Sequence, residues 1–274
     1  MPLIAMTREM GSLGMDVARI LESELKVPLV YHEMINNLAD KMRLRKSHVV
    51  RLLGGKASLL ERLTADKTSL SIYTADEILQ VASKGAVMRG WGAAHLLRPV
   101  RHAIRVRVCA PFELRLKRMM ERLGTDDREA VASEIRASDE AQGAIARRHF
   151  DVDWQDPEGY DLSLNTERMS VEQCAEKIAR LAGQPQFRET DESRKALADL
   201  ALQANVKAAL RADPSTRALS FAVDSDGAQV RMRGIVATRE ESNQATRVVM
   251  GVQGVMSVKN DLRITAEIRS PMGE

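Results

Sequence analysis

Aromatic residues are scarce in this sequence, because Phe, Trp and Tyr together make up only 3% of its 274 residues. Proteins that hold single-stranded nucleic acid stack the bases on several aromatic side chains, so this scarcity argues against such a role. A basic surplus is also lacking, since 41 Lys and Arg stand against 38 Asp and Glu. General binding of DNA or RNA requires many uncompensated cations. We therefore do not expect a nucleic-acid partner.

Cysteine is almost absent, and the two that occur, Cys109 and Cys174, are far apart in the sequence. No CxxC pair occurs, and the five histidines show no paired ligand spacing, so no metal centre of the usual Cys/His type is predicted. Both cysteines lie in apolar surroundings, on an expected strand and an expected helix. We expect reduced core thiols, as in cytosolic proteins.

Long hydrophobic runs are missing as well. No stretch approaches the ~20 apolar residues of a membrane-spanning helix, and the N-terminus lacks the basic and apolar regions of a signal peptide. We expect no integral membrane segment and a cytoplasmic location. Hydrophobic residues still make up 44% of the chain, and 274 residues are enough for two domains with cores of their own.

The first part of the chain, residues 1–185, alternates short apolar runs with amphipathic stretches. The apolar runs predict strands at residues 3–6, 27–31, 86–90, 103–110 and 160–166. Between and after them lie helical patterns, of which the longest covers residues 128–150. Residues 170–183 begin with a serine N-cap and end with glycine, as a helix does. Alternating strands and helices predict an α/β fold with a five-stranded parallel sheet covered by helices on both faces.

The pattern changes after residue 185. Residues 186–192 are polar, follow a Gly and a Pro, and are interpreted as a linker. Residues 193–267 then predict a helix, two strands joined at Asp226-Gly227, a second helix and a third strand. This αββαβ order indicates a small α+β domain, with residues 268–274 left as a tail.

A candidate phosphate-binding loop follows the first strand, in the stretch REMGSLGMD. Such loops bind anions because backbone N–H groups and a helix N-terminus converge on the phosphate. The usual pattern, GxxxxGK[ST], is not matched: Arg8 stands at its first glycine, Gly14 at the lysine and Asp16 at the hydroxyl position. Arg8 could supply the missing charge, because guanidinium pairs well with phosphate oxygens. Asp16 could equally be an acid favoured by the helix dipole.

Several segments together resemble the cytidylate-kinase-like family, a branch of the nucleoside monophosphate kinases. These are IAMTREMGSLGMDVARILESEL, VMRGWGAAHLLR, IRVRVCAPFELRLKRMMERL and DVDWQDPEGYDLSLNTERMSVEQCAEKI, within residues 2–182. Loops of this family typically lack the lysine. The resemblance implies a P-loop kinase sheet that binds ATP and Mg²⁺. The implied loop residues are Arg8, Gly11, Ser12, Leu13, Gly14, Met15 and Asp16, with Arg8 and Asp16 also catalytic and Asp16 the candidate magnesium ligand.

The resemblance also implies a monophosphate-binding region. The family's GRG element appears here as Gly90-Trp91-Gly92, with Arg89 beside it. Arg89, Trp91 and Gly92 are therefore candidate substrate-binding residues, although Trp91 could stack on a base or pack in the core. Asp139 is a further candidate.

A mobile lid over the phosphates is implied for residues 124–150, because lid arginines neutralise charge on the transferred group in this superfamily. The position three residues after Asp139, where the family often has an arginine, is Gln142. The lid candidates are Arg118, Arg122, Arg147 and Arg148, of which Arg147 and Arg148 are also candidate catalytic residues. A single arginine on a charged helix could instead belong to a solvated face.

Residues 193–267 resemble a BON domain through NVKAALRADPSTRALSFAVDSDGAQVRMRGIV and GVQGVMSVKNDLRI. BON domains are generally binding modules, which implies a protein or phospholipid partner. Two functions remain open. One is an ATP-dependent kinase that phosphorylates a nucleoside monophosphate or another small acceptor. The other is a nucleotide-responsive protein with weak or no catalysis, whose BON domain docks a partner.

Overall fold

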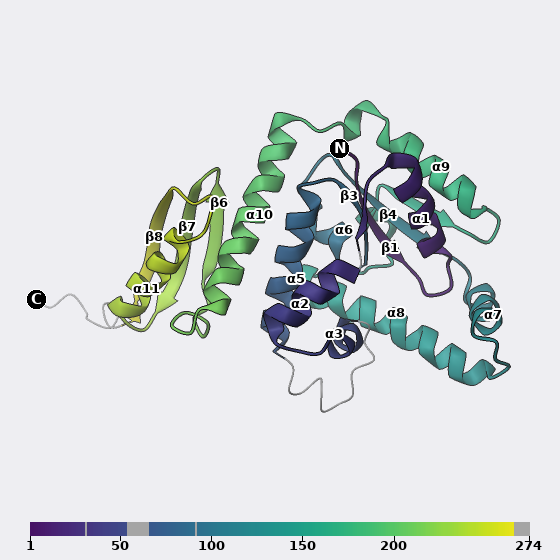
Figure 1. The fold of residues 1–274 in the computed structure, drawn as a ribbon, viewed down its shortest axis with the longest axis horizontal. Coiled ribbons are helices and arrows are strands. Elements are labelled where there is room, and N and C mark those ends of the chain that lie inside the picture. Colours follow the sequence, from purple (N-terminus) through teal and green to yellow (C-terminus); the bar gives the residue numbers. More distant parts are fainter. Residues whose placement is uncertain (31, 54–65, 91, 266–274) are drawn as a thin grey trace, which may run out of the picture.

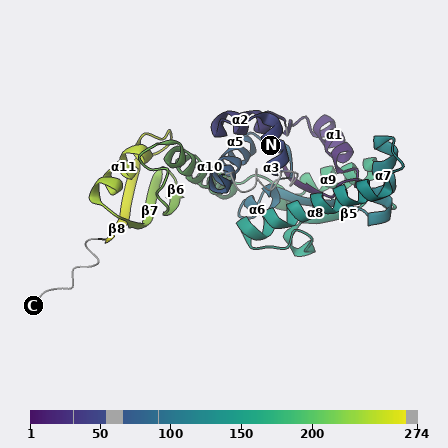
Figure 2. The same cartoon turned by 90° about the horizontal axis from the view of Figure 1, so that it is seen from below.

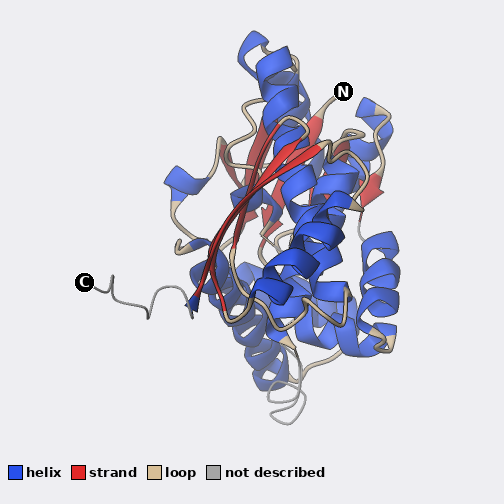
Figure 3. Cartoon of the chain, turned by 90° about the vertical axis from the view of Figure 1, so that its left-hand side faces the viewer, coloured by secondary structure: helices blue, strands red, loops and turns tan. Residues whose placement is uncertain are grey.

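A computed structural model describes residues 1–30, 32–53, 66–90 and 92–265. Five strands form a parallel sheet in the order β2-β3-β1-β4-β5. They are β1 (Leu3–Arg8), β2 (Leu29–Val30), β3 (Ala86–Arg89), β4 (Ala103–Cys109) and β5 (Leu162–Asn165). Helices surround this sheet (Figures 1 and 3), which confirms the predicted α/β fold.

Each face of the sheet is closed by its own set of helices. Helices α1 (Gly14–Leu25) and α9 (Val171–Ala182) bury Val17 and Ile178 against Ile4 and Met6 of β1. Helices α5 (Lys67–Ala82) and α6 (Ala93–Leu96) cover the other face. Alternate residues of β1 enter the two cores because side chains alternate along a strand. Apolar side chains on both faces are what a parallel sheet between two helical layers requires.

Four more helices flank the carboxyl ends of the strands. They are α2 (His32–Met42), α3 (Lys46–Leu53), α7 (Phe112–Leu123) and α8 (Arg128–Phe150). Helix α8 begins at Asp127, whose side chain accepts a hydrogen bond from Ala130 N–H, so the predicted helix over residues 128–150 is confirmed. Two short 3₁₀ helices, η1 (Pro157–Gly159) and η2 (Pro185–Phe187), lie in the connections before β5 and after α9.

The C-terminal part has the predicted αββαβ order. It consists of α10 (Asp191–Ala212), β6 (Ala222–Asp226), β7 (Gln229–Val236), α11 (Arg239–Met250) and β8 (Ser257–Ile264). Strand β7 lies in the middle of the sheet, antiparallel to β6 and parallel to β8. Val206 and Leu210 of α10 and Val249 of α11 pack on one face of this sheet, together with Val230 and Met232 of β7.

Helix α10 belongs to both cores. Its Leu197 and Ala204 pack with α5 in the core of the larger sheet, whereas Val206 and Leu210 pack in the smaller core. Seen from below, the smaller sheet extends from one end of the larger unit with α10 at the junction (Figure 2). The expected linker over residues 186–192 contains the end of η2 and the start of α10. The two sheets are thus joined through one continuous helix.

Within the described ranges, no helix combines the length and apolar character needed to cross a membrane.

Candidate functional site

The candidate loop lies where the strand order of the larger sheet changes direction. From β1 the chain proceeds through α1 to β2 and β3 on one side, and then passes to β4 on the other side. Ligands of open α/β sheets bind outside the carboxyl ends of the strands at such a switch point. Residues 9–13, between the end of β1 and the start of α1, occupy this place.

Two residues of the loop have a left-handed backbone, Gly11 with φ 81° and Leu13 with φ 62°. A Cβ on Gly11 would lie 2.7 Å from the carbonyl oxygen of Arg115, so glycine is needed there for close packing as well as for its conformation. Leu13 precedes the first residue of α1 and has no side-chain cap. A left-handed leucine costs about 1–2 kcal/mol, and such strain gathers at functional sites.

The buried carboxylate of Glu9 connects the loop to neighbouring elements. Glu9 is only 5% exposed. Its Oε1 accepts a hydrogen bond of 2.6 Å from Arg107 Nη2, and its Oε2 accepts one of 3.1 Å from the backbone N–H of Ala110. Arg115 Nε lies 3.3 Å from the same Oε2. Because a buried charge is tolerated only when it is paired and hydrogen-bonded, these contacts fix the start of the loop to β4 and α7.

Donors from three other elements engage the carbonyl oxygens of the loop. Gln142 of α8 donates to the carbonyl of Arg8 at 2.9 Å, and the Thr166 hydroxyl donates to that of Ser12 at 3.0 Å. Longer bonds run from Arg115 to Met10 O, 3.4 Å, and from Arg118 to Gly11 O, 3.5 Å. The carbonyl oxygens of the loop are therefore engaged by hydrogen-bond donors from other parts of the protein.

Some backbone N–H groups of the loop, unlike its carbonyl oxygens, make no hydrogen bond within the described part of the chain. None of the hydrogen bonds found among the described residues uses the N–H of Gly11, Leu13 or Gly14. Unpaired N–H groups at the N-terminus of a helix are the donors that bind anions in phosphate loops. With its carbonyls engaged and these N–H groups available, the loop is suited to an anionic ligand.

Gly14, the residue at the usual lysine position, makes room for Arg8. A Cβ on Gly14 would lie 2.7 Å from Arg8 Cβ and 3.3 Å from Arg8 Cδ. The side chain of Arg8 therefore lies directly against the first residue of α1. Since Gly14 has no positive φ, its absence of a side chain is required by this contact and not by the backbone conformation.

A cavity of about 260 Å³, here named the loop cavity, opens beside Arg8. Its walls come from the ends of β1 and β3 and from α2, α3, α6 and α8, and its lining includes Arg8, Arg89, His95, Gln142 and Trp154. Arg89 is only 9% exposed. Burial lowers the pKa of His95, and the charges of Arg105 and Arg98 lower it further, so this imidazole is neutral near pH 7.

A model of the cytidylate kinase-like family matches residues 3–168 of the chain. The chain belongs to this family. A BON domain model matches residues 198–266, so the resemblances seen in the sequence are confirmed for both parts.

Two solved structures that are similar to this chain have low sequence identity to it. A protein from Eubacterium ventriosum is 20% identical at a TM-score of 0.51, over 66% of this chain and 98% of that one. Shikimate kinase from Acinetobacter baumannii, in complex with shikimate, is 16% identical at a TM-score of 0.41, over 66% and 92%. The likeness to the Eubacterium ventriosum protein, at 20% identity, concerns the fold alone.

A curated relative matches only in part. Uronate isomerase from Corynebacterium glutamicum is 29% identical over 102 residues, which are 37% of this chain. The chain spans 20% of the length of that relative.

The four arginines expected to act as lid residues have different surroundings in the structure. Arg118 contacts the loop, donating to Gly11 O and also to the hydroxyl and carbonyl of Thr166. Arg122 and Arg147 are exposed on α7 and α8, and neither lines a described cavity. Arg148 lines a second, larger cavity. The segment expected as a lid is α8 together with the turn before it.

Asp139 and the GRG-like segment also have defined positions. Both oxygens of Asp139 accept hydrogen bonds from Arg115, at 3.1 and 2.9 Å, and the residue lines neither cavity. Gly92 lines the loop cavity, and a Cβ on it would lie 2.5 Å from the Phe150 ring. Trp91, the candidate stacking residue, lies outside the described residues.

Asp16 lies in the first turn of α1, with 43% of its side chain exposed and Arg19 at 3.6 Å. The described part of the chain contains no group of three His, Cys, Asp or Glu that could hold a metal ion by itself. Mg²⁺ is commonly held by one or two carboxylates and by the substrate's phosphates. Asp16 fits that mode, in which the bound nucleotide provides the remaining ligands.

Sequence reasoning missed Glu9, Arg107, Arg115 and Thr166. A signal was present in the sequence, because a glutamate inside a loop that binds phosphate would repel the ligand unless cations paired with it. The alternation in IRVRVCA could have suggested Arg107 as such a partner, because it places two arginines on one face of a strand beside β1. Arg115 could not be inferred, because its contact with Glu9 depends on how α7 packs.

Proposed function

We propose that this cytidylate-kinase-like protein binds ATP with Mg²⁺ at the loop and transfers the γ-phosphoryl group to a nucleoside monophosphate or another small acceptor. The observation that carries the proposal is the contact between Arg8 and Gly14. It lays the aliphatic part of the Arg8 side chain, up to Cδ, against the N-terminus of α1, where other phosphate loops have lysine. Arg8 then neutralises phosphate charge in the lysine's place.

The charge balance around the loop supports an anionic ligand. Four arginines, Arg8, Arg107, Arg115 and Arg118, belong to the loop or contact it or its glutamate, whereas two carboxylates, those of Glu9 and Asp139, are bound within the same network. Among these groups the arginines outnumber the carboxylates by four to two. Phosphoryl transfer needs little else from the protein, because catalysis is mostly positioning and charge neutralisation.

The loop cavity is the proposed acceptor site. Arg8 and Arg89 both line it, so an acceptor that carries a phosphate can be bound opposite the loop. In this proposal Arg89, Gly92 and Trp91 contact the acceptor, and Asp139 acts by holding Arg115. Mg²⁺, when bound between the nucleotide phosphates and Asp16, would supply charge neutralisation that the protein side chains do not provide.

One observation favours the second function, a nucleotide-responsive protein with weak catalysis. Of the four expected lid arginines, the exposed Arg122 and Arg147 lie off the cavity and Arg148 lines another one. Arg118 is bound to protein carbonyls. In this reading, nucleotide binding is transmitted through α10, which packs in both cores, to a protein or phospholipid partner of the BON domain.

A direct assay separates the two functions. The full chain is incubated with ATP–Mg²⁺ and a panel of nucleoside monophosphates, and diphosphate formation is followed by ³¹P NMR. Product from one acceptor establishes the kinase. A thermal shift with ATP but no product from any acceptor leaves the binding function, and no shift with any nucleotide refutes both.

Two variants test the role of Arg8. Arg8→Ala should lower the turnover rate by a factor of at least 10², because removal of one charge-stabilising donor costs about 2.7–4 kcal/mol of barrier. Arg180→Ala, which removes an exposed arginine from the last turn of α9, is the matched control and should retain full activity. If Arg8→Ala retains full activity, Arg8 does not perform the role that lysine has in other phosphate loops.

A further inference from the structure

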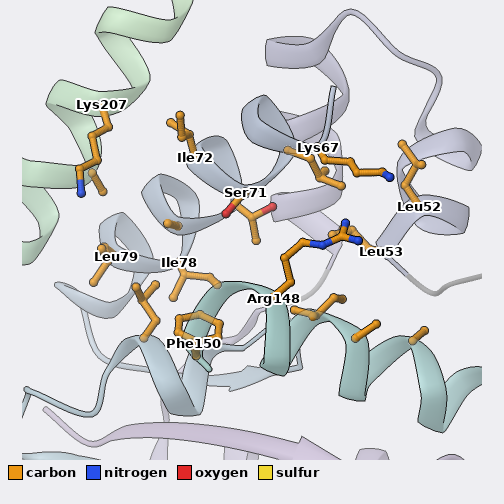
Figure 4. Close-up of a pocket in the computed structure, with 18 of the residues that line it drawn as sticks. Leu52, Leu53, Lys67, Ser71, Ile72, Ile78, Leu79, Arg148, Phe150 and Lys207 are labelled. Carbon is orange, nitrogen blue, oxygen red and sulfur yellow. The ribbon is translucent and has the colours of Figure 1, made fainter. Parts of the chain in front are cut away.

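A second cavity, larger than the loop cavity, lies elsewhere among the described residues. It has a volume of about 550 Å³ and lies between α5, α8 and α10, with contributions from α3 and α6 (Figure 4). Pockets that take small molecules measure roughly 300–1,000 Å³ and combine an apolar lining with a few polar groups. We name this space the apolar cavity.

Its lining is aliphatic. Leucine, isoleucine and alanine side chains dominate, among them Leu52, Ile72, Ile78 and Leu200, and Phe150 contributes the one aromatic ring among the described lining residues. Ser71, Thr74 and Gln203 are the uncharged polar side chains among the described lining residues, so most of the walls are apolar. Such walls offer no stacking surface on both sides of a base. They match a flexible hydrocarbon chain, which gains free energy from burial alone.

Positive charge surrounds this lining. Lys67, Arg148 and Lys207 come from three different helices, and Glu140 is the one acid among the described lining residues. No ion pair found between described residues involves any of these three cations. In Figure 4, Lys67 and Arg148 reach toward the end of the cavity near Leu52 and Leu53, while Lys207 comes from α10 on the other side.

We propose that the apolar cavity binds a single-chain fatty-acid carboxylate. The chain lies against the aliphatic walls of α5, α8 and α10, and the carboxylate faces Lys67 and Arg148 at the end near Leu52 and Leu53. An apolar cavity with a net positive rim selects an amphipathic anion over a neutral alcohol, which gains nothing from the charges, and over an amphipathic cation, which they repel.

The apolar cavity lies between the loop cavity and helix α10. Leu53, Ala141 and Ile145 line both the apolar cavity and the loop cavity, so the two spaces share a wall. The opposite wall is α10, which continues into the smaller core. A bound fatty acid would therefore contact the helix that carries Gln142 and the helix that carries the BON domain. The binding itself does not depend on the proposed kinase function.

The test uses the full chain and sodium dodecanoate below its micelle concentration, followed by isothermal titration calorimetry and native mass spectrometry. We expect saturable binding of one dodecanoate per chain. Dodecanol should bind at least tenfold more weakly, and dodecyltrimethylammonium should not bind. Absence of saturable dodecanoate binding, or equal affinity for dodecanol, would overturn the proposal.

Variants locate the site. Ala144→Phe fills the cavity from an exposed position of α8 and should weaken dodecanoate binding at least tenfold; Ala137→Phe, on the same lining, is the second filling variant. Ala130→Phe, in the first turn of the same helix and outside the cavity, is the matched control and should bind as the unaltered chain does. Dodecanoate affinity that survives both filling variants would refute the location.

A second pair of variants tests the charge. Lys67→Met combined with Arg148→Met should lower the dodecanoate affinity severalfold toward that of dodecanol, and should leave dodecanol binding unchanged. Equal losses for the two ligands would show that these side chains act through packing, and would overturn the assignment of a carboxylate.

Discussion

Replacing Gly14 by alanine tests the contact on which the proposed function rests. Alanine is normally the better helix former, and glycine in a helix costs about 0.5–1 kcal/mol relative to it. Here the added Cβ would lie 2.7 Å from Arg8 Cβ, closer than carbon atoms pack, and Gly14 is buried. The close contact therefore predicts that Gly14→Ala destabilises the protein, whereas the helix propensity predicts that it stabilises the protein.

The magnitude follows from these two terms. Forcing an extra carbon into a packed site costs about 1–3 kcal/mol. The gain in helix propensity offsets part of this cost, so Gly14→Ala should destabilise the protein by about 1–2 kcal/mol. Nucleotide binding at the loop should weaken as well, because Arg8 must move to relieve the contact.

Urea unfolding of the two proteins measures the effect on stability, and a nucleotide titration measures the effect on the loop. Gly183→Ala is the control: Gly183 ends α9 with φ −79°, and the nearest atom to an added Cβ is 3.6 Å away. It should be neutral or stabilising by about 0.4–1 kcal/mol. If Gly14→Ala is stabilising like Gly183→Ala, Arg8 does not occupy the space at the N-terminus of α1.

A double-mutant cycle identifies the partner. Arg8→Gly removes the atom closest to the added Cβ, so the cost of Gly14→Ala should fall by about 1 kcal/mol or more in that background. Equal costs of Gly14→Ala with and without Arg8 would refute the contact even if the single variant is destabilising.

Two further predictions concern charges that support the fold. Glu9→Gln leaves Arg107 without its carboxylate and Arg115 with Asp139 alone, and should destabilise the protein by about 3 kcal/mol in urea unfolding; a change below 1 kcal/mol would mean that Glu9 does not bind them. Burial alone would raise the pKa of Asp66, but hydrogen bonds from Ser69 and Arg211 outweigh it and lower this pKa to about 2. The resulting stabilisation is fully present above the unfolded pKa of about 4 and is lost as the pH falls through 2. In thermal melts, Asp66→Asn should therefore be less stable than the unaltered protein at pH 7 and equally stable near pH 2, and a difference independent of pH would contradict this.

The parallel sheet and the small αββαβ unit were predictable because local patterns specify them. Period-two alternation and short apolar runs define strands, and the strands at residues 86–90 and 103–110 appear in the structure as β3 and β4. The long helix over residues 128–150 was predictable from its continuous helical composition. The position of the loop followed from its place after the first strand.

The surroundings of the loop were only partly predictable. Arg8, Gly11 and Gly14 lie within one stretch of seven residues, so the sequence could suggest that they act together. The contacts of Arg115 and Gln142 with the loop span 105 and 134 residues of chain. Nothing local in the sequence determines which face of α7 or α8 meets the loop, because that depends on how the helices pack.

Local composition alone therefore determined the element order, the two-part organisation and the candidate phosphate loop with its missing lysine. Tertiary structure decided that Glu9 is neutralised by Arg107 and Arg115, that Asp139 holds Arg115, and that Arg148 lines an apolar cavity. It also decided that α10 belongs to both cores. The physical reason is the same in each case. Backbone conformation follows from neighbouring residues, whereas the pairing of buried charges and the position of a cavity depend on distant segments packed against one another.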